Sequence, residues 1–173
     1  IDKYGNQYVC GYYNSGTSTS DPSFGIILPP KDFGKEGYVA KIDSTGTWQW
    51  VRSAMGGWDE RTLGLCVDKV NDFVYVTGTC WNYTDFGSCV GATFPGSGDN
   101  IFIGKFDLSG TCQWLLGAGG AADDHGYDLV TDKLGNIYLT GLIGPYSNPA
   151  TFGAISIPHP TGDSLGFVAK LNP

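Results

Sequence analysis

Short apolar runs separated by glycine-rich turns make up most of the chain, and several of these runs recur in a fixed order. The phrase DKYGNQYVCG at residues 2–11 returns as DKLGNIYLTG at 132–141 and, with one extra residue, as DKVNDFVYVTG at 68–78. Gly and Asn tolerate a positive φ angle, so each copy predicts a tight turn followed by a strand. The copy at 68–78 lacks the Gly-Asn pair, and we expect its turn to be remodelled.

A second phrase recurs at the same spacing. YVAKIDSTGTWQW at 38–50 returns 64 residues later as FIGKFDLSGTCQW at 102–114, and again, truncated, as FVAKLNP at 167–173. Each unit also contains a Phe-Gly pair, at Phe24-Gly25, Phe86-Gly87 and Phe152-Gly153. A recurring order of phrases at a fixed period is typical of repeat architectures. We infer a repeat unit of about 65 residues.

The repeat predicts an all-β fold, because the runs are too short and too interrupted by glycine for helices. Ten strands are expected, at 6–13, 38–43, 48–54, 62–67, 73–79, 101–107, 112–117, 127–131, 137–143 and 167–171. Four-stranded antiparallel sheets packed face to face are the blades of a β-propeller. We therefore predict a single domain, 1–173, that is a β-propeller-like array of about two and a half blades. Its parts are a partial blade at 1–57, a full blade at 58–120 and a partial blade at 121–173.

Three long loops, at 14–36, 80–100 and 144–165, lie between the second and third strands of each unit. Each contains the Phe-Gly pair and a later apolar residue followed by Pro. Apolar residues at matching places favour a packed Ω-like loop or a small extra hairpin.

The combination D-x-x-G-N-x-Y-V-T-G, Phe-Gly, F-V-A-K-L-D-x-x-G-x-x-x-W and Gly-Gly resembles the bacterial β-propeller repeat of SBBP type. The resemblance covers nearly the whole chain. Such repeats are common in secreted and cell-surface proteins and serve mainly as scaffolds and binding platforms. The resemblance therefore implies an extracellular or cell-surface location and a structural or binding role.

The predicted strand series opens on a second strand and closes on a third. A closed single-chain propeller usually has about four to eight blades. Unpaired edges and uncovered apolar faces favour association, because another chain can add to them. We expect a homo-oligomer or polymer, either a ring or a filament, that completes its blades with neighbouring chains. The alternatives are a fragment of a larger secreted propeller protein and a glycan- or surface-binding module of lectin or adhesin type.

Composition narrows the functions further. The chain has 173 residues, a net charge of −7 and 10 Lys and Arg residues without a basic stripe, so we expect no nucleic-acid partner. No apolar run approaches the length of a membrane helix. The serine-hydrolase and zinc-protease signatures are absent, which favours a non-enzymatic protein without a cofactor. Of five cysteines, Cys80 and Cys89 flank a loop that a disulfide between them would close.

The candidate ligand-binding residues are acidic pairs and loop aromatics. Asp59-Glu60 and Asp123-Asp124 follow two Gly-Gly pairs, Gly56-Gly57 and Gly119-Gly120. Paired carboxylates either bind Ca²⁺ or sugar hydroxyls or cap turns. Their recurrence favours a structural role. Aromatic side chains stack on sugar rings, and the candidates in loops are Trp58, Trp81, Tyr83 and Tyr146.

Two further features have less specific interpretations. Asn82 begins an N-glycosylation triplet in a loop. Lys41, Lys105 and Lys170 recur in the middle of the third strand of each unit, and we expect them to pair with carboxylates of the repeat.

Overall fold

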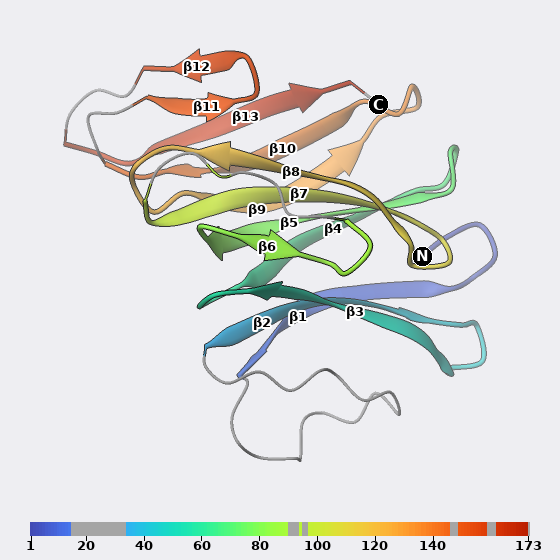
Figure 1. Ribbon diagram of the computed structural model, residues 1–173. Coiled ribbons are helices and arrows are strands. Elements are labelled where there is room, and N and C mark those ends of the chain that lie inside the picture. Colours follow the sequence, from blue (N-terminus) through green and yellow to red (C-terminus); the bar gives the residue numbers. More distant parts are fainter. Residues whose placement is uncertain (15–33, 90–93, 95–96, 146–148, 159–161, 173) are drawn as a thin grey trace.

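The protein is described by a computed structural model in which residues 1–14, 34–89, 94, 97–145, 149–158 and 162–172 are placed. The described elements are β-strands joined by turns, arranged in three antiparallel sheets that lie one above another (Figure 1). This confirms the all-β class. All ten predicted strands are present within a few residues of the expected bounds, and three short strands are added to them.

Sheet I contains β1 (Gln7–Asn14), β2 (Lys35–Ile42), β3 (Trp48–Gly56) and the two-residue strand β6 (Thr84–Asp85), in that order. Sheet II contains six strands in the order β12-β11-β8-β7-β5-β4. Its four long strands are β4 (Arg61–Asp68), β5 (Phe73–Trp81), β7 (Asp99–Asp107) and β8 (Cys112–Gly119). Sheet III contains β13 (Leu165–Leu171), β10 (Ile137–Ile143) and β9 (His125–Thr131).

The short strands show what two of the long loops do. The hairpin of β11 (Ala150–Phe152) and β12 (Ile155–Ile157) pairs with β8, although its loop joins two strands of sheet III. In the same way β6 comes from a loop of sheet II and pairs with β3 of sheet I. Each loop therefore extends the outer edge of the preceding sheet, and the loop at 144–165 forms a small extra hairpin, one of the two arrangements expected for these loops. The loop at 14–36 lies mostly outside the described residues.

The recurring ten-residue phrase forms a turn organised by its first aspartate. The Asp132 carboxylate accepts the backbone N–H groups of Leu134 and Asn136 at 2.8 and 3.0 Å and the Asn136 side-chain amide at 2.7 Å. Asp2 makes the same set of bonds in sheet I, to Tyr4 and Asn6. Glycine in both turns takes a positive φ. The phrase is therefore a β-turn whose backbone donors are satisfied by an aspartate.

The copy at 68–78 is remodelled as predicted. Asp68 accepts the backbone N–H groups of Val70 and Asn71 at 2.9 and 3.0 Å. The positive φ then falls on Asp72, at 60°, where the other copies have glycine. Aspartate is among the few residues that tolerate this conformation, so the extra residue is accommodated without glycine.

The three sheets pack through two apolar layers. Sheets I and II bury a cluster that includes Tyr8, Val39, Trp50, Val74, Val76, Phe102, Phe106 and Leu115. Sheets II and III bury a second cluster that includes Tyr75, Ile101, Ile103, Leu129, Ile137 and Leu139. Neighbouring residues of β5, such as Val74 and Tyr75, point to opposite faces and enter different clusters. Both faces of sheet II are buried, which explains why its strands are apolar throughout.

The disulfide links different cysteines from those expected. Cys89 pairs with Cys112 at the start of β8, with 5.5 Å between their Cα atoms, and Cys80 is a free, fully buried thiol opposite Asn100 in β7. The predicted Cys80–Cys89 bridge is therefore wrong. The loop turns away from β5 at Asn82, pairs with sheet I through β6 and brings Cys89 back over β8. Closeness in the sequence therefore indicated the wrong partner for Cys89.

The recurring lysines contact aromatic rings rather than carboxylates. Lys41 lies opposite Tyr8 in the strand register, Lys105 opposite Tyr75 and Lys170 opposite Tyr138. Each ammonium group sits 5.5 to 5.6 Å from the centroid of its tyrosine ring. Among the described residues none of these lysines makes an ion pair, so the carboxylate pairing is replaced by a cross-strand cation–π contact in all three sheets.

Candidate functional site

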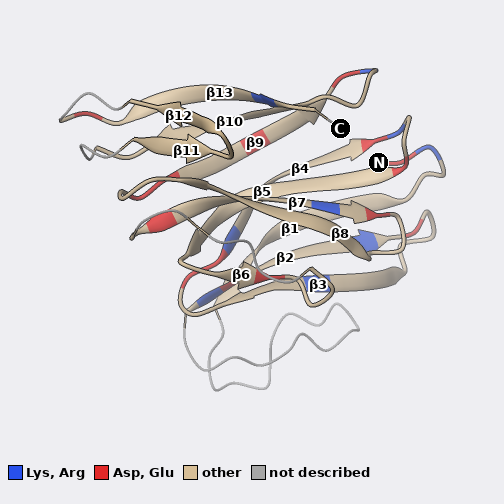
Figure 2. Cartoon of the chain, turned by 45° about the horizontal axis from the view of Figure 1, so that its top comes forward, with Lys and Arg blue, Asp and Glu red and all other residues tan. Residues whose placement is uncertain are grey.

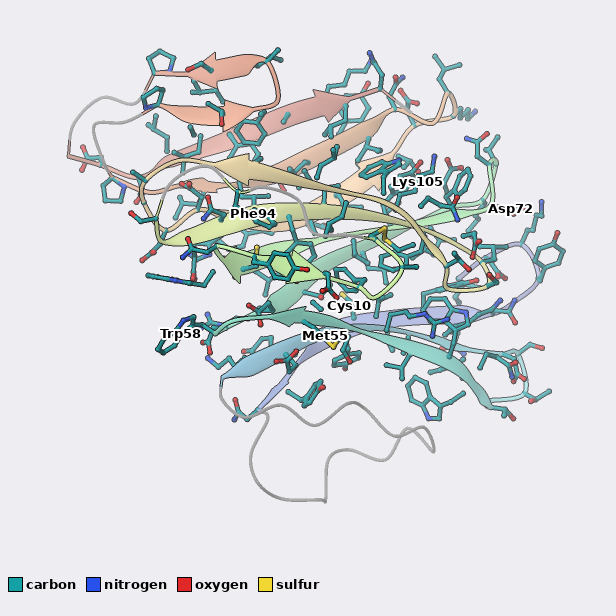
Figure 3. All side chains as sticks on the ribbon, viewed as in Figure 1. Cys10, Met55, Trp58, Asp72, Phe94 and Lys105 are labelled. Carbon is teal, nitrogen blue, oxygen red and sulfur yellow. A yellow bond between two sulfur atoms is a disulfide. The ribbon has the colours of Figure 1, made fainter. Side chains whose placement is uncertain are left out.

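A pocket of about 480 Å³ opens where sheets I and II meet, at the end of β5 and the beginning of β4 and β7. It is lined by Trp58, Asp59, Arg61, Trp81 and Asp99. Trp81 and Asp99 are direct partners in the register of β5 and β7. Figure 3 shows Trp58 at one end of the molecule and Asp72, in the β4–β5 turn, at the opposite end. The pocket volume lies within the usual range for small-ligand sites.

Asp59 is held in place by the neighbouring sheet. Its Oδ1 accepts the backbone N–H of Lys35 at 3.0 Å, and its Oδ2 lies 2.7 Å from Arg61 Nη2 and 3.6 Å from Lys35 Nζ. Partial burial opposes ionisation of this carboxyl, but Arg61 and the Lys35 N–H outweigh it and hold the pKa of Asp59 below its ordinary value. Asp59 therefore joins the start of β4 to the start of β2.

The hydrogen bonds between an acidic pair and the start of a strand in the preceding sheet form a backbone clamp, and this clamp recurs one repeat later. Asp123 accepts the backbone N–H of Asp99 at 3.1 Å, as Asp59 accepts that of Lys35. The next residue of each acidic pair donates its backbone N–H to the same partner: Glu60 to the Lys35 carbonyl at 2.8 Å and Asp124 to the Asp99 carbonyl at 2.7 Å. The acidic pairs thus tie the start of β4 to the start of β2, and the start of β9 to the start of β7.

Glu60 and Asp124 are fully buried. The Asp124 carboxylate accepts the backbone N–H groups of Gly120 and Gly144, while burial raises its pKa above the ordinary value despite these bonds. Side chains enclosed in this way do not face a ligand in solution. Of the four acidic candidates, only Asp59 lines the pocket.

The aromatic candidates also divide into residues that line the pocket and residues that do not. Trp58 and Trp81 both line the pocket, with 66% and 38% of their surface exposed. Tyr83 is exposed but is not among the residues lining the pocket, and its hydroxyl donates to Asp85 at 2.8 Å. Tyr146 lies outside the described residues. Asn82 is exposed with a positive φ of 59°, and its glycosylation stays a prediction.

Arg61 and Asp99 are site residues that the sequence analysis did not single out. Arg61 directly follows an acidic pair, and its equivalent in the next unit is His125, so it departs from the repeat. Asp99 is the first residue of β7 and occupies the position that Lys35 occupies in sheet I. Burial raises the pKa of Asp99, and the neighbouring Asp123 carboxylate raises it further.

Charges of the described chain lie mainly at strand ends and turns, where acidic and basic positions are mixed (Figure 2). Within the described ranges, no group of three His, Cys, Asp or Glu side chains is arranged to hold a metal ion. A search of the same residues for a helix long and apolar enough to cross a membrane finds none.

Repeated antiparallel sheets, stacked with recurring turns and cross-strand pairs, define this protein as an all-β repeat protein. Comparison with protein families identifies the repeat. Residues 113–143 match the family described as "SBBP: Beta-propeller repeat", so the chain contains a β-propeller repeat of the predicted type. The matched segment covers most of β8, all of β9 and all of β10, and thus includes the junction between sheets II and III. No curated protein matches the chain.

Proposed function

We propose that this chain is a non-enzymatic structural protein of the extracellular space or cell surface, with about two and a half propeller blades. In this proposal sheets I, II and III are successive blades, and the chain self-associates by completing its blades with neighbouring copies. The SBBP-type repeat at 113–143 supports the propeller assignment. The surface of sheet III supports the association.

The observation that carries the proposal is the exposure of one repeat position, which differs among the three sheets. Val39, Ile103 and Val168 occupy the same place in the recurring third-strand phrase. Val39 and Ile103 are 0% and 2% exposed, because sheet II covers the first and sheet III the second. Val168 is 73% exposed. Val130 and Tyr127 of β9 are also exposed.

The junction of sheets II and III is also more open beside its tryptophan than the junction of sheets I and II. Around Trp50, the turn after β7 fills the space between sheets I and II. Its counterpart Trp114 borders a pocket of about 250 Å³ that is also lined by Leu116, Leu171 and Asn172. Among the described residues β13 is an edge strand, and an edge strand beside exposed apolar side chains such as Val168 and Val130 is a surface to which another β-sheet can add.

Light scattering on the purified chain tests this proposal. We expect a mass above the 18.4 kDa of one chain, with the fraction of oligomer rising with concentration. Val168→Lys places a charge on the uncovered face and should shift the population to monomer. Val70→Lys is the matched control, because Val70 is 65% exposed in the β4–β5 turn of sheet II. A wild-type chain that remains monomeric at all concentrations would contradict self-association.

A second candidate function is glycan binding, and the pocket of Trp58 and Trp81 favours it. Exposed indole rings beside carboxylates offer both a stacking surface and hydrogen-bond acceptors for a sugar. A glycan array probed with labelled protein, with and without Ca²⁺, tests this function. An array without any hit in either condition would argue against it.

A further inference from the structure

All the pocket residues except Asp59 stand at positions where the chain departs from its own repeat. Trp58 is replaced by Ala122 at the equivalent place in the next unit, as judged from the matching bonds of Asp59 and Asp123. Trp81 is replaced by Gly144, three residues after the glycine that ends the YVTG or YLTG phrase. The next junction keeps the same backbone clamp without either tryptophan. The clamp therefore does not account for two large, exposed indole rings at this end of the molecule.

Both tryptophans present their polar and apolar surfaces to solvent. Trp58 and Trp81 are exposed, and within the described chain neither indole N–H has a hydrogen-bond acceptor. The exposed part of an indole ring forgoes the apolar burial that a core position would provide. Two such rings lining one pocket form a surface on which the C–H face of a sugar ring can stack.

The charge that remains available in this pocket is negative. Arg61 and Lys35 both lie against Asp59, and the negative charge of this carboxylate therefore largely balances their positive charges. The Asp99 carboxylate accepts no hydrogen bond from any described residue, although it lines the pocket beside Trp81. Burial raises the pKa of Asp99, the nearby Asp123 carboxylate raises it further, and His125 and Arg61 oppose the shift. A ligand that brings a cationic group to Asp99 would relieve this repulsion.

From these observations we propose that the pocket binds an amino sugar, with the ring stacked on Trp81 or Trp58 and the ammonium group placed at Asp99. This inference rests on the glycan-binding function proposed above and specifies its ligand class. An ammonium group over an indole face also gains a cation–π attraction, which a neutral or acidic sugar lacks. An acidic sugar would meet the Asp99 carboxylate, and the chain's net charge of −7 would oppose its approach.

The test is a titration of the full chain followed by tryptophan fluorescence and calorimetry. The probes are oligomers of glucosamine, of N-acetylglucosamine and of galacturonic acid, compared at one pH and one salt concentration. We expect the glucosamine oligomer to bind at least about tenfold more tightly than the N-acetylated one, and the galacturonate oligomer not to bind. Asp99→Asn should reduce glucosamine binding about tenfold and leave binding of the N-acetylated oligomer nearly unchanged.

Two substitutions locate the stacking surface. Trp81→Ala and Trp58→Ala should each weaken binding of the glucosamine oligomer. Tyr4→Ala and Asp163→Asn are the matched controls, because both residues are exposed. Tyr4 lies in a turn at the end of the molecule opposite the pocket, where Lys3 pairs with Asp72. A loss of binding that is the same in the controls would overturn the site.

The outcomes separate the two levels of the proposal. Binding of no oligomer would overturn both the glycan-binding function and the amino-sugar ligand. Equal affinity for the glucosamine and N-acetylglucosamine oligomers, unchanged by Asp99→Asn, would overturn the amino-sugar inference alone. Near-ultraviolet circular dichroism of each variant establishes that a lost signal is not lost folding.

Discussion

The indole Nε1 of Trp50 in sheet I donates a hydrogen bond to the backbone carbonyl of Leu108, in the turn after β7 of sheet II, at 3.1 Å. The Leu108 carbonyl also accepts Lys41 Nζ at 3.0 Å, and the ring lies against Gly110, where an added Cβ would be 2.6 Å from the indole. Trp50→Phe removes the bond and part of the packing. We expect a loss of about 1–2 kcal/mol in the free energy of unfolding, measured by urea denaturation.

Trp114→Phe is the matched comparison, because Trp114 holds the equivalent place in sheet II. Among the described residues its indole N–H has no acceptor, and it borders an open pocket. In the monomer this substitution should cost clearly less than Trp50→Phe. Equal costs for the two would contradict the packing difference between the two junctions.

Gly64 in β4 lies against sheet III. An added Cβ would meet the Asp128 Cα at 2.7 Å and the Tyr127 carbonyl oxygen at 2.8 Å, and neither backbone atom can move without shifting β9. Gly64→Ala should therefore destabilise the fold by about 1–3 kcal/mol. Gly57→Ala is the control, since a Cβ added at Gly57 would meet no atom within 4 Å. Thermal unfolding of both variants measures the difference, and a Gly64→Ala variant as stable as wild type would refute the close contact.

The strands were predictable because their signals are local. Turn aspartates, glycines with positive φ and apolar runs lie within a few residues of one another, so Asp2, Asp68 and Asp132 each reveal a turn and the strand after it. The repeat then predicted the order of the strands along the chain. The pairing of β6 and β11 with a preceding sheet was not predictable, because a two- or three-residue strand has no pattern of its own.

The errors concern contacts that depend on the path of a loop or on strand pairing, and not on local sequence. Cys89 reaches Cys112 across a loop that first pairs with another sheet, and no spacing in the sequence encodes that path. The pocket was half predicted: Trp58 and Trp81 stand out as loop-end aromatics, whereas Asp99 is recognisable only once β5 and β7 are in register. Glu60 and Asp124 share the acidic pattern of Asp59, yet their burial depends on packing.

The disulfide should contribute substantially to stability. It closes a loop over a sequence separation of 23 residues, for which loop-closure entropy predicts about 3 kcal/mol. Cys112→Ser or reduction should lower the free energy of unfolding by about this amount, measured in urea with and without dithiothreitol. Cys80→Ala should leave the bridge intact. Peptide mapping under non-reducing conditions that finds Cys80 joined to Cys89 would contradict the structure.

The turn aspartates predict how stability depends on pH. The Asn136 side chain donates to Asp132, and with the backbone N–H groups it holds the pKa of Asp132 below its ordinary value in the folded chain. A folded-state pKa below the unfolded one means that the unfolded chain binds the proton more tightly. The stabilisation is therefore present above the ordinary aspartate pKa of about 4 and is lost as pH falls through the folded value.

Asp132→Asn separates this contribution from other effects of acid. The amide turns a donor toward the Asn136 amide and the Tyr138 hydroxyl, which both donate to Asp132 in the wild type, at 2.7 and 3.2 Å. The variant should be less stable than wild type at about pH 7, and the difference should shrink as Asp132 becomes protonated toward about pH 2. Urea midpoints at several pH values measure it, with Asp163→Asn as an exposed control. A stability difference that stays constant over this range would show that the Asp132 charge does not stabilise the turn.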